Sequence, residues 1–296
     1  MRVLVVGADG AIGAALVESL RSRGHQAIGT TRRRAKIGNP ETMFLDLAAE
    51  MLEPLPQVDI AVICAAMARF EECRNNPDQA RRVNVEAPKE IADKVLASGG
   101  RVLLLSTSAV FDCLKPLRRA DELCAPRSAY GRFKAEAEEA VLGFGAGAGV
   151  VRLTKVVRAD SGIFPGWVES LMQGGPITAF EDHTLCPLPL ALVVSVLTDI
   201  IECGEGGIFQ ISGAGDISYL DAARNLATHL GVPHEQVIAT SAASAGLLPG
   251  EITPFTSLET SRLAAMIGFV PPEARAVLTG MYAEALARAR MSAVHH

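Results

Sequence analysis

A tyrosine and a lysine lie four residues apart in the stretch YGRFK, at Tyr130 and Lys134. The flanking residues are rich in alanine and glutamate and predict a helix over 129–144, on which positions i and i+4 share a face. A neighbouring ammonium favours the phenolate form, so Lys134 is expected to lower the pKa of Tyr130 and make it a usable general acid. Such pairs also occur on ordinary exposed helices. The rest of the sequence therefore has to decide between a catalytic pair and an ordinary surface pair.

Two hydroxyl residues, Ser106 and Thr107, end the apolar stretch RVLLLST, about 23 residues before Tyr130. Ligands of doubly wound sheets bind beyond the carboxyl ends of the strands. Thr107 is therefore placed to hydrogen-bond a substrate carbonyl, with Ser106 as the weaker candidate. Local capping of the backbone is the alternative use of such a hydroxyl.

A glycine-rich loop, VVGADGAIG, joins the first apolar run to the first helical pattern. Its three glycines allow a tight turn and a close approach to a pyrophosphate, which the free N–H groups at a helix start then bind. The GxxGxxG spacing in this strand–turn–helix context predicts a dinucleotide-binding loop. The expected contacts are Gly7, Asp9, Gly10, Ala11, Ile12 and Gly13.

The second apolar run, QAIGTT, ends in Thr31, Arg32 and Arg33 and offers no acidic residue. An acid at this point binds the ribose 2′-hydroxyl of NAD, whereas arginine suits the 2′-phosphate of NADP. We therefore expect NADP, as NADPH, rather than NAD. The cluster continues through Arg34 and Lys36, and a solvated basic loop is its alternative use.

Short apolar runs alternate with helical patterns at 3–6, 26–31, 42–47, 58–66, 101–107, 149–157 and 207–213. Their continuous apolar character indicates a sheet covered on both faces. We expect an α/β fold with a Rossmann-type doubly wound parallel sheet, formed by residues 1–158 and about 187–215. Residues of about 159–186 and 216–296 are expected to form a small, mostly helical C-terminal substrate lobe. The pattern over 77–100 predicts one long helix that ends at a Gly-Gly pair.

Composition excludes several classes of function. The chain of 296 residues has a net charge of −5, so the basic surplus of a nucleic-acid binder is missing. Its six scattered cysteines form neither a CxxC pair nor a zinc-ligand pattern, which favours a reducing compartment and no metal. We find no signal peptide and no apolar run long enough to span a membrane, so a cytoplasmic protein is expected.

Four stretches together resemble the extended short-chain dehydrogenase/reductases, also called the NAD-dependent epimerase/dehydratase family. They are the glycine loop, STSAVFD at 106–112, PRSAYGRFKAEAE at 126–138 and RLTKVV at 152–157. The closest resemblance is to the dTDP-4-dehydrorhamnose reductase-like branch, and it extends over about residues 1–230. Residues 64–88 are similar to the same branch.

The resemblance implies a catalytic set of Thr107, Tyr130 and Lys134. Reduced cofactor would deliver hydride to a 4-keto carbon of a sugar nucleotide, and Tyr130 would protonate the alkoxide while Thr107 holds that oxygen. Lys134 and Tyr130 would also contact the cofactor, Lys134 through the hydroxyls of the nicotinamide ribose. Further cofactor contacts are expected from Asp46, Leu47, Cys64, Ala65, Ala66 and Asn84.

The lobe offers fewer signals. Trp167, the only tryptophan, falls where the family opens a helix beside the sugar nucleotide, so its ring either stacks on a base or is buried. Arg152, Lys155 and Arg158 are candidate diphosphate ligands, with ordinary exposed positions as the alternative. The expected substrate contacts are Thr107, Ser108, Trp167 and Arg158.

Departures from the family pattern leave alternatives open. The usual TDYVF reads TSAVF at 107–111, which lacks the acidic pair of the dehydratases and is nearer to epimerases. An NAD-dependent sugar-nucleotide epimerase is therefore one alternative. A non-catalytic NAD(P)-binding regulatory subunit, as in methionine adenosyltransferase, is another. The identity of the sugar and base stays open, as does a homodimer.

Overall fold

The computed structural model describes residues 1–33, 41–50 and 54–294. In this part of the chain seven parallel strands form one sheet, in the order β11-β6-β5-β4-β1-β2-β3. The strands are β1 (Arg2–Val6), β2 (Gln26–Thr31), β3 (Thr42–Phe44), β4 (Ile60–Ile63), β5 (Arg101–Thr107), β6 (Ala148–Leu153) and β11 (Gly207–Ile211). The predicted Rossmann-type α/β fold is confirmed.

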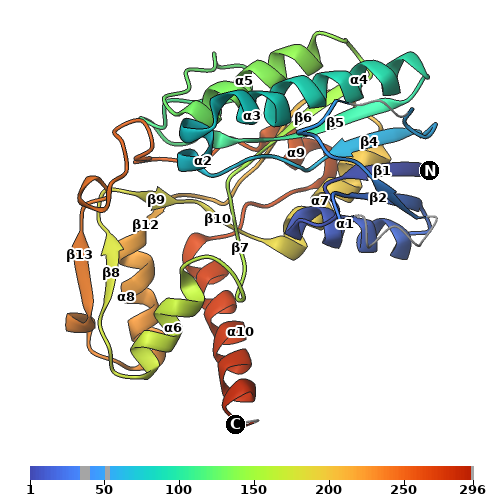
Figure 1. Ribbon diagram of the computed structural model, residues 1–296. Helices are drawn as coiled ribbons and strands as arrows, with labels where there is room; N and C mark the ends of the chain where they lie inside the picture. Colours follow the sequence, from blue (N-terminus) through green and yellow to red (C-terminus); the bar gives the residue numbers. More distant parts are fainter. Residues whose placement is uncertain (34–40, 51–53, 295–296) are drawn as a thin grey trace.

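Helices cover both faces of this sheet (Figure 1). On one face lie α1 (Ala11–Ser22) and α7 (Leu190–Cys203), and on the other α4 (Ala87–Ala97) and α5 (Ala129–Leu142). Successive residues of β1 enter the two cores alternately, which explains why the strands are apolar at nearly every position. The carboxyl ends of the strands share one edge, where ligand sites of this architecture form.

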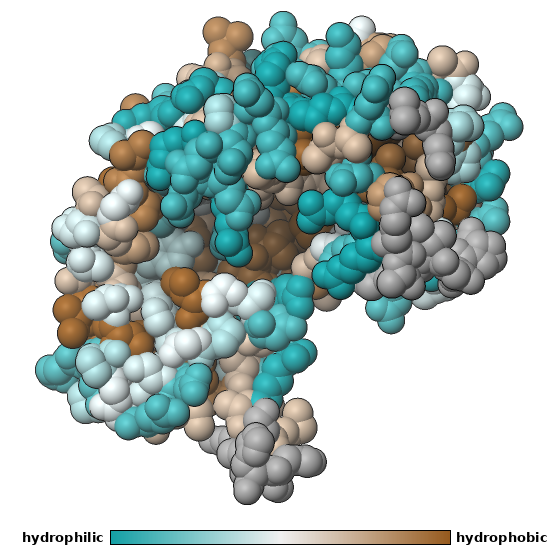
Figure 2. All heavy atoms as spheres, in the orientation of Figure 1, coloured by the Kyte–Doolittle hydropathy of each residue, from teal (hydrophilic) through white to brown (hydrophobic). Residues whose placement is uncertain are grey.

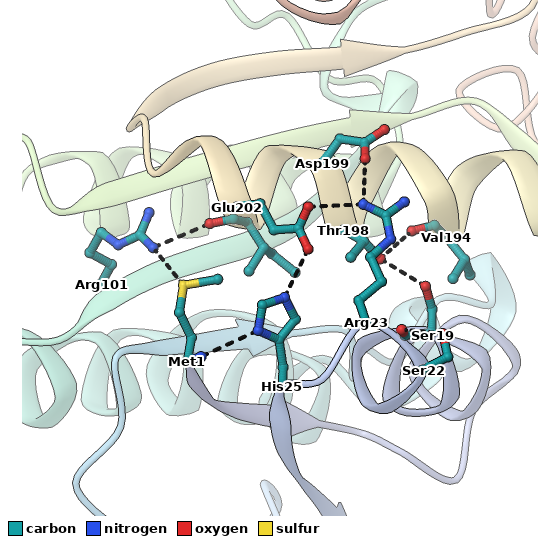
Figure 3. A network of polar contacts seen from close by, with 11 residues as sticks. Met1, Ser19, Ser22, Arg23, His25, Arg101, Val194, Thr198, Asp199 and Glu202 are labelled. Atoms are coloured by element: carbon teal, nitrogen blue, oxygen red, sulfur yellow. Dashed lines mark hydrogen bonds and ion pairs between the residues drawn. The ribbon is translucent and has the colours of Figure 1, made fainter.

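The opposite edge of the sheet carries a polar network that joins the start of the chain to α7 (Figure 3). Arg23 donates to Asp199 at 2.7 Å and to Glu202 at 2.9 Å. The Nε2 atom of His25 lies 2.8 Å from the other carboxylate oxygen of Glu202. Because these groups surround the amino ends of the strands, they brace α7 far from the expected site.

The C-terminal lobe has its own core, which is separate from the two cores of the sheet. Its helices are α6 (Phe164–Met172), α8 (Tyr219–Leu230) and α10 (Ala274–Val294). They pack with short strand pairs that the sequence mostly did not predict, because runs of two to four residues carry little periodicity. The pairs are β8 (Ile177–Phe180) with β13 (Val237–Thr240), β9 (Thr184–Leu185) with β12 (Ile217–Ser218), and β7 (Lys155–Val157) with β10 (Pro187–Pro189). The single strand expected over 149–157 is divided after Leu153, and its last part, Lys155–Val157, pairs outside the main sheet.

Two helices next to the site differ from a simple pattern. The single helix expected over 77–100 is present as a continuous helical segment from Pro77 to Ala97, but a π-helical turn at Arg82–Glu86 joins α3 (Pro77–Arg81) to α4 and interrupts the regular α pattern. A short helix, α2 (Phe70–Asn75), precedes them. Returning from the lobe, α9 (Ser261–Ile267) packs Leu263 into the core beneath α1 and α7. Across the described ranges, no helix combines the length and apolar character needed to cross a bilayer.

Candidate active site

The helix that carries Tyr130 and Lys134 begins at a capped position. The hydroxyl of Ser128 accepts the backbone N–H of Gly131 at 3.0 Å, which satisfies one of the free donors at the start of α5. Tyr130 is half-buried in the first turn and its ring lies 6.2 Å from that of Phe70. Lys134, one turn later, is only 1% exposed. The expected helix is present and buries the lysine.

Gly131 allows the first turn of α5 to dock beside the end of β5. A Cβ atom at this position would lie 2.1 Å from the carbonyl oxygen of Ala109, in the 3₁₀ turn Ser108–Val110. Only a glycine permits this approach, so it brings Tyr130 close to the strand end at Thr107. The sequence interpretation missed Gly131, although a glycine in the first turn of a helix is a usable signal because it costs helix stability.

The two hydroxyl residues at the end of β5 have different environments. The oxygen of Thr107 accepts the backbone N–H of Ala109 at 3.2 Å, which is the capping use. Its own proton remains available for donation, because a hydroxyl both accepts and donates. Ser106 is 6% exposed, and its hydroxyl has no hydrogen-bond partner among the described residues. Ser108, in the following turn, is buried as well.

Burial controls the titration of the tyrosine and the lysine. It raises the pKa of Tyr130 above its ordinary value, with a smaller contribution from Cys73. It lowers the pKa of Lys134 to about 8, although the charge of Glu138 acts in the opposite direction. The expectation that Lys134 lowers the pKa of Tyr130 is therefore wrong, because desolvation of the phenolate dominates. At neutral pH Tyr130 holds its proton.

A cavity of about 430 Å³ opens at the carboxyl ends of β1, β2 and β4. Gly7 has a φ of +93°, and a Cβ atom there would meet the backbone of Ala65 at 2.8 Å. A Cβ atom on Gly13 would lie 2.3 Å from the oxygen of Gly7, so both positions require glycine. The predicted contacts that line the cavity are Gly7, Asp9, Gly10, Thr31, Arg32, Arg33, Asp46, Leu47, Cys64, Ala65 and Ala66.

The remaining predicted cofactor residues lie outside this lining: Ala11, Ile12, Gly13, Asn84, Tyr130 and Lys134. Asn84 acts through a neighbour, because its side chain accepts the N–H of Met67 and donates to the oxygen of Met67, each at 2.9 Å. Met67 itself lines the cavity. Burial raises the pKa of Cys64 to about 12, so this thiol is uncharged at neutral pH.

The end of β2 presents both signs of charge to the cavity. Arg32 and Arg33 are exposed and line it. The hydroxyl of Thr31 donates to Asp9 at 2.5 Å and accepts the N–H of Arg33 at 3.0 Å. Thr30, which the sequence interpretation missed, accepts the N–H of Gly7 at 3.0 Å and so fixes the glycine loop. Arg34 and Lys36 lie outside the described residues.

Trp167 belongs mainly to the interior of the lobe. It is 8% exposed and meets Phe164 and Tyr219 edge to face, with ring centroids 5.5 and 6.4 Å apart. The remaining edge of its ring lines a pocket of about 350 Å³, together with Phe180 and Thr240. The indole is therefore buried, as one of the two alternatives expected, and it also borders a pocket, while stacking on a base stays a prediction.

The three candidate diphosphate ligands lie in different environments in the structure. Arg152 is only 2% exposed and pairs with Glu138, so it cannot reach a ligand between the lobes. Arg158 is half-buried and forms a two-pronged pair with Asp160 at 2.6 and 2.8 Å. Lys155 is exposed at the start of β7.

The surface is hollowed between the sheet domain and the lobe, and the floor of the hollow is largely apolar (Figure 2). Phe70, which packs beside Tyr130, lines a small cavity together with Gly250 and Thr253 from the lobe side. An ion pair between Arg74 and Glu251 also links α2 to this segment. Tyr130 therefore lies on the side of the sheet that faces the lobe.

Comparison with known proteins agrees with this architecture. The model of a protein family described as "RmlD substrate binding domain" matches residues 1–287. A probable low-salt glycan biosynthesis reductase of Haloferax volcanii is 28% identical over 244 residues, which cover 78% of this chain and 81% of the relative. The dTDP-4-dehydrorhamnose reductase of Mycolicibacterium smegmatis is 28% identical over 242 residues, 80% and 71% of the two chains.

A different kind of relative is the methionine adenosyltransferase 2 subunit beta of Pongo abelii. It is 32% identical over 182 residues, 61% of this chain, and the match spans about half of that relative, 52%.

Solved structures share the fold over nearly the whole chain. A dTDP-4-dehydrorhamnose reductase of Bacillus anthracis in complex with NADP superposes with a TM-score of 0.79, at 19% identity, over 96% of this chain and 99% of that one. MoeE5 in complex with UDP-glucuronic acid and NAD superposes with a TM-score of 0.78, at 22% identity, over 96% and 99%.

Proposed function

Because the chain belongs to the RmlD substrate-binding-domain family, within the extended short-chain dehydrogenase/reductases, we propose that it reduces a 4-keto sugar nucleotide with NADPH and that Tyr130 supplies the proton. The chain is an NAD(P)-dependent oxidoreductase of this type, and its function is like that of dTDP-4-dehydrorhamnose reductase. The observation that carries the proposal is the close packing of the first turn of α5, which holds Tyr130, against the turn that follows Thr107, at the end of the sheet where the glycine-loop cavity also opens.

The residues around the cavity suit a dinucleotide. Gly7 and Gly13 permit the tight backbone packing of the glycine loop, because a Cβ atom at either position would clash. Gly10 is the N-cap residue directly before α1, so the loop leads to the free N–H groups of a helix start. Arg32 and Arg33 would hold a 2′-phosphate, which favours NADPH. When bound, NADPH supplies the hydride. Fluorescence titration with NADPH and with NADH tests the preference of the protein for NADPH. Equal affinities for the two cofactors would contradict that preference.

The chain's own residues would handle the substrate oxygen and its proton. Tyr130 stays protonated at neutral pH, which is the form that a general acid needs. Thr107 keeps a hydroxyl proton to donate to the same oxygen while its own oxygen is held by Ala109. Lys134 is a cation below a pH of about 8 and would bind the nicotinamide ribose.

The substrate class rests on the lobe and on the family. MoeE5 binds UDP-glucuronic acid, which is a sugar nucleotide. The pocket edged by Trp167 and Phe180 is proposed to take the base, because aromatic faces stack on bases. Ser108 and Arg158 stay proposed substrate contacts.

A homodimer stays a proposal as well. Light scattering on the purified protein measures its mass and so tests this oligomeric state.

Replacement of Tyr130 by phenylalanine is the decisive test. We expect turnover of a 4-keto sugar nucleotide to fall by about a hundredfold or more, because general acid catalysis is lost, while NADPH still binds. The matched control is Tyr282→Phe, which removes a buried hydroxyl that bonds Ala222 inside the lobe. Retained turnover in Tyr130→Phe would overturn the catalytic assignment.

Two other functions stay testable on the same protein. NAD⁺ that remains bound through purification would favour a sugar-nucleotide epimerase. The match to methionine adenosyltransferase 2 subunit beta keeps a regulatory subunit in view. Absence of NADPH oxidation with a panel of keto sugar nucleotides, together with a partner enzyme that co-purifies, would favour that function.

A further inference from the structure

A buried ion pair lies one turn beyond Lys134, on the face of α5 that carries Tyr130 and Lys134. Arg152, in β6, and Glu138, in α5, are each 2% exposed. The guanidinium donates to the carboxylate through Nη2 at 2.7 Å and through Nε at 3.1 and 3.2 Å. This fork geometry constrains the rotation of α5 against the sheet, because the hydrogen bonds depend on direction as well as on distance.

The same guanidinium holds the loop that connects Thr107 to α5. Its Nη1 atom donates to the oxygen of Ala120 at 3.1 Å, and its Nη2 atom lies 3.4 Å from the sulfur of Cys124. Its centre also lies 4.9 Å from the middle of the Phe111 ring. Arg152 therefore contacts this loop at its beginning and near its end.

Stability alone does not account for this pair. Removing two charges from water is costly, and an apolar pair of similar size is often at least as stable. A buried pair whose hydrogen bonds also reach a loop constrains the position of that loop, because each bond depends on direction. The pair of Arg152 and Glu138 contacts α5 and the loop between Thr107 and α5, and these two segments determine how Tyr130 lies relative to Thr107.

We propose that Arg152 and Glu138 are positioning residues of the reductase, which hold α5 and the loop before it so that Tyr130 and Lys134 face Thr107. This inference rests on the proposed function, because it concerns the geometry of that reaction. Neither residue lines the cofactor cavity, so both act through the residues that they position.

The pair also has an electrostatic consequence for Lys134. Glu138 lies one turn after Lys134 on the same face of α5, and its negative charge favours the ammonium form. The titratable groups that act on Lys134 are Glu138 and, from the loop after β4, Cys64. Arg152 pairs with Glu138. Loss of the pair should therefore move the alkaline limb of the activity profile to lower pH.

The experiment compares three variants of the full chain. Glu138→Leu combined with Arg152→Met replaces the pair by apolar side chains, Arg152→Lys keeps the charge without the fork, and Glu136→Gln is the control. Glu136 lies on the same helix in an exposed pair with Arg81. For each variant we measure kcat and KM against pH, NADPH affinity, and amide hydrogen exchange over residues 107–134.

We expect the apolar double variant to remain folded and to lose at least about tenfold in kcat, with a smaller change in KM and an alkaline limb at lower pH. Arg152→Lys should have a kcat between that of the double variant and that of the native chain. Its amide hydrogen exchange over residues 107–134 should be faster than in the native chain. Glu136→Gln should match the native chain. An unchanged exchange pattern with an unchanged pH profile would overturn the inference.

Hydrogen exchange keeps this test separate from the proposed function. If the native chain reduces no keto sugar, the proposed function fails, but the exchange rates still report whether the pair holds α5 and its loop. If the native chain is active and both apolar and lysine variants keep its kcat and exchange, the positioning role fails alone.

Discussion

Lys134 shows how strongly a fold alters a single residue. Its ammonium is almost completely enclosed, and the pKa falls from an ordinary value of 10.5 to about 8. Since the folded-state pKa lies below the unfolded one, the charge costs stability at every pH below about 8. That cost fades as the pH rises from about 8 to 10.5.

Replacement of Lys134 by methionine should therefore stabilise the protein at neutral pH. The shift corresponds to roughly 3 kcal/mol at pH 7, falling towards zero above pH 10.5. Urea unfolding at pH 7 and at pH 10.5 measures the difference. The exposed Lys89→Met is the matched control and should change little at either pH. A variant that is less stable than the native chain at pH 7 would contradict the prediction.

Gly131 is the second residue whose role depends on one contact. A Cβ atom in Gly131→Ala would meet the oxygen of Ala109 at 2.1 Å, so α5 has to move away from the turn after Thr107. We expect a loss of about 1–3 kcal/mol of stability, as for other overpacked sites, and a large fall in turnover.

Thermal unfolding and steady-state kinetics check this prediction. Gly280→Ala is the matched control, because that helical position has open space around it and the change should stabilise by about 0.5–1 kcal/mol. Equal behaviour of the two variants would count against a role for close packing at Gly131.

At the scale of elements, the π-helical turn between α3 and α4 is the main departure from a regular pattern. Such turns often occur at functional sites. Here the turn contains Asn84, whose amide satisfies both backbone groups of Met67 beside the glycine-loop cavity. Because the hydrogen-bond partner lies 17 residues earlier in the chain, helical periodicity gave no sign of it.

Asn84→Ala should weaken cofactor binding without removing a direct contact. It leaves the N–H and the oxygen of Met67 without their partner, which should cost about 1–3 kcal/mol of stability and loosen the cavity wall. Isothermal titration with NADPH and a thermal melt measure both effects. The control is Asn76→Ala, whose side chain makes only a long exposed bond of 3.4 Å to Glu72. Unchanged affinity would show that Met67 needs no such support.

At the scale of the whole molecule, the sheet domain and the lobe meet around the hollow seen in Figure 2. The pair of Arg74 and Glu251 crosses between them, from α2 to the segment before α9. The other oxygen of Glu251 accepts the N–H of Leu248 at 3.0 Å, and Glu251 as a whole is 7% exposed. This contact holds the lobe segment near Phe70 and hence near Tyr130.

Arg74→Met should release that segment. Arg74 keeps 38% of its side chain exposed, so the loss is expected to be near 1 kcal/mol rather than that of a buried pair. Faster amide exchange over residues 248–253 is the expected signature. The double variant Arg74→Met with Glu251→Gln should recover part of the stability, because no unpaired carboxylate remains. If amide exchange over residues 248–253 in Arg74→Met matches that of the native chain, the ion pair of Arg74 with Glu251 does not hold this segment.

The sequence by itself determined the features that local pattern encodes. Alternating apolar runs and helices predicted the parallel sheet, the GxxGxxG spacing predicted the cavity-lining loop, and the four-residue spacing placed Tyr130 and Lys134 on one helix. These succeed because periodicity and turn chemistry act between near neighbours in the chain.

Only the tertiary structure decided the environments of those residues. It raised the pKa of Tyr130 where a lowered value was expected, and it buried Arg152 against Glu138 rather than leaving it for a ligand. It also required a glycine at position 131. Each of these depends on desolvation or on contact between segments remote in sequence, which spacing along the chain does not encode.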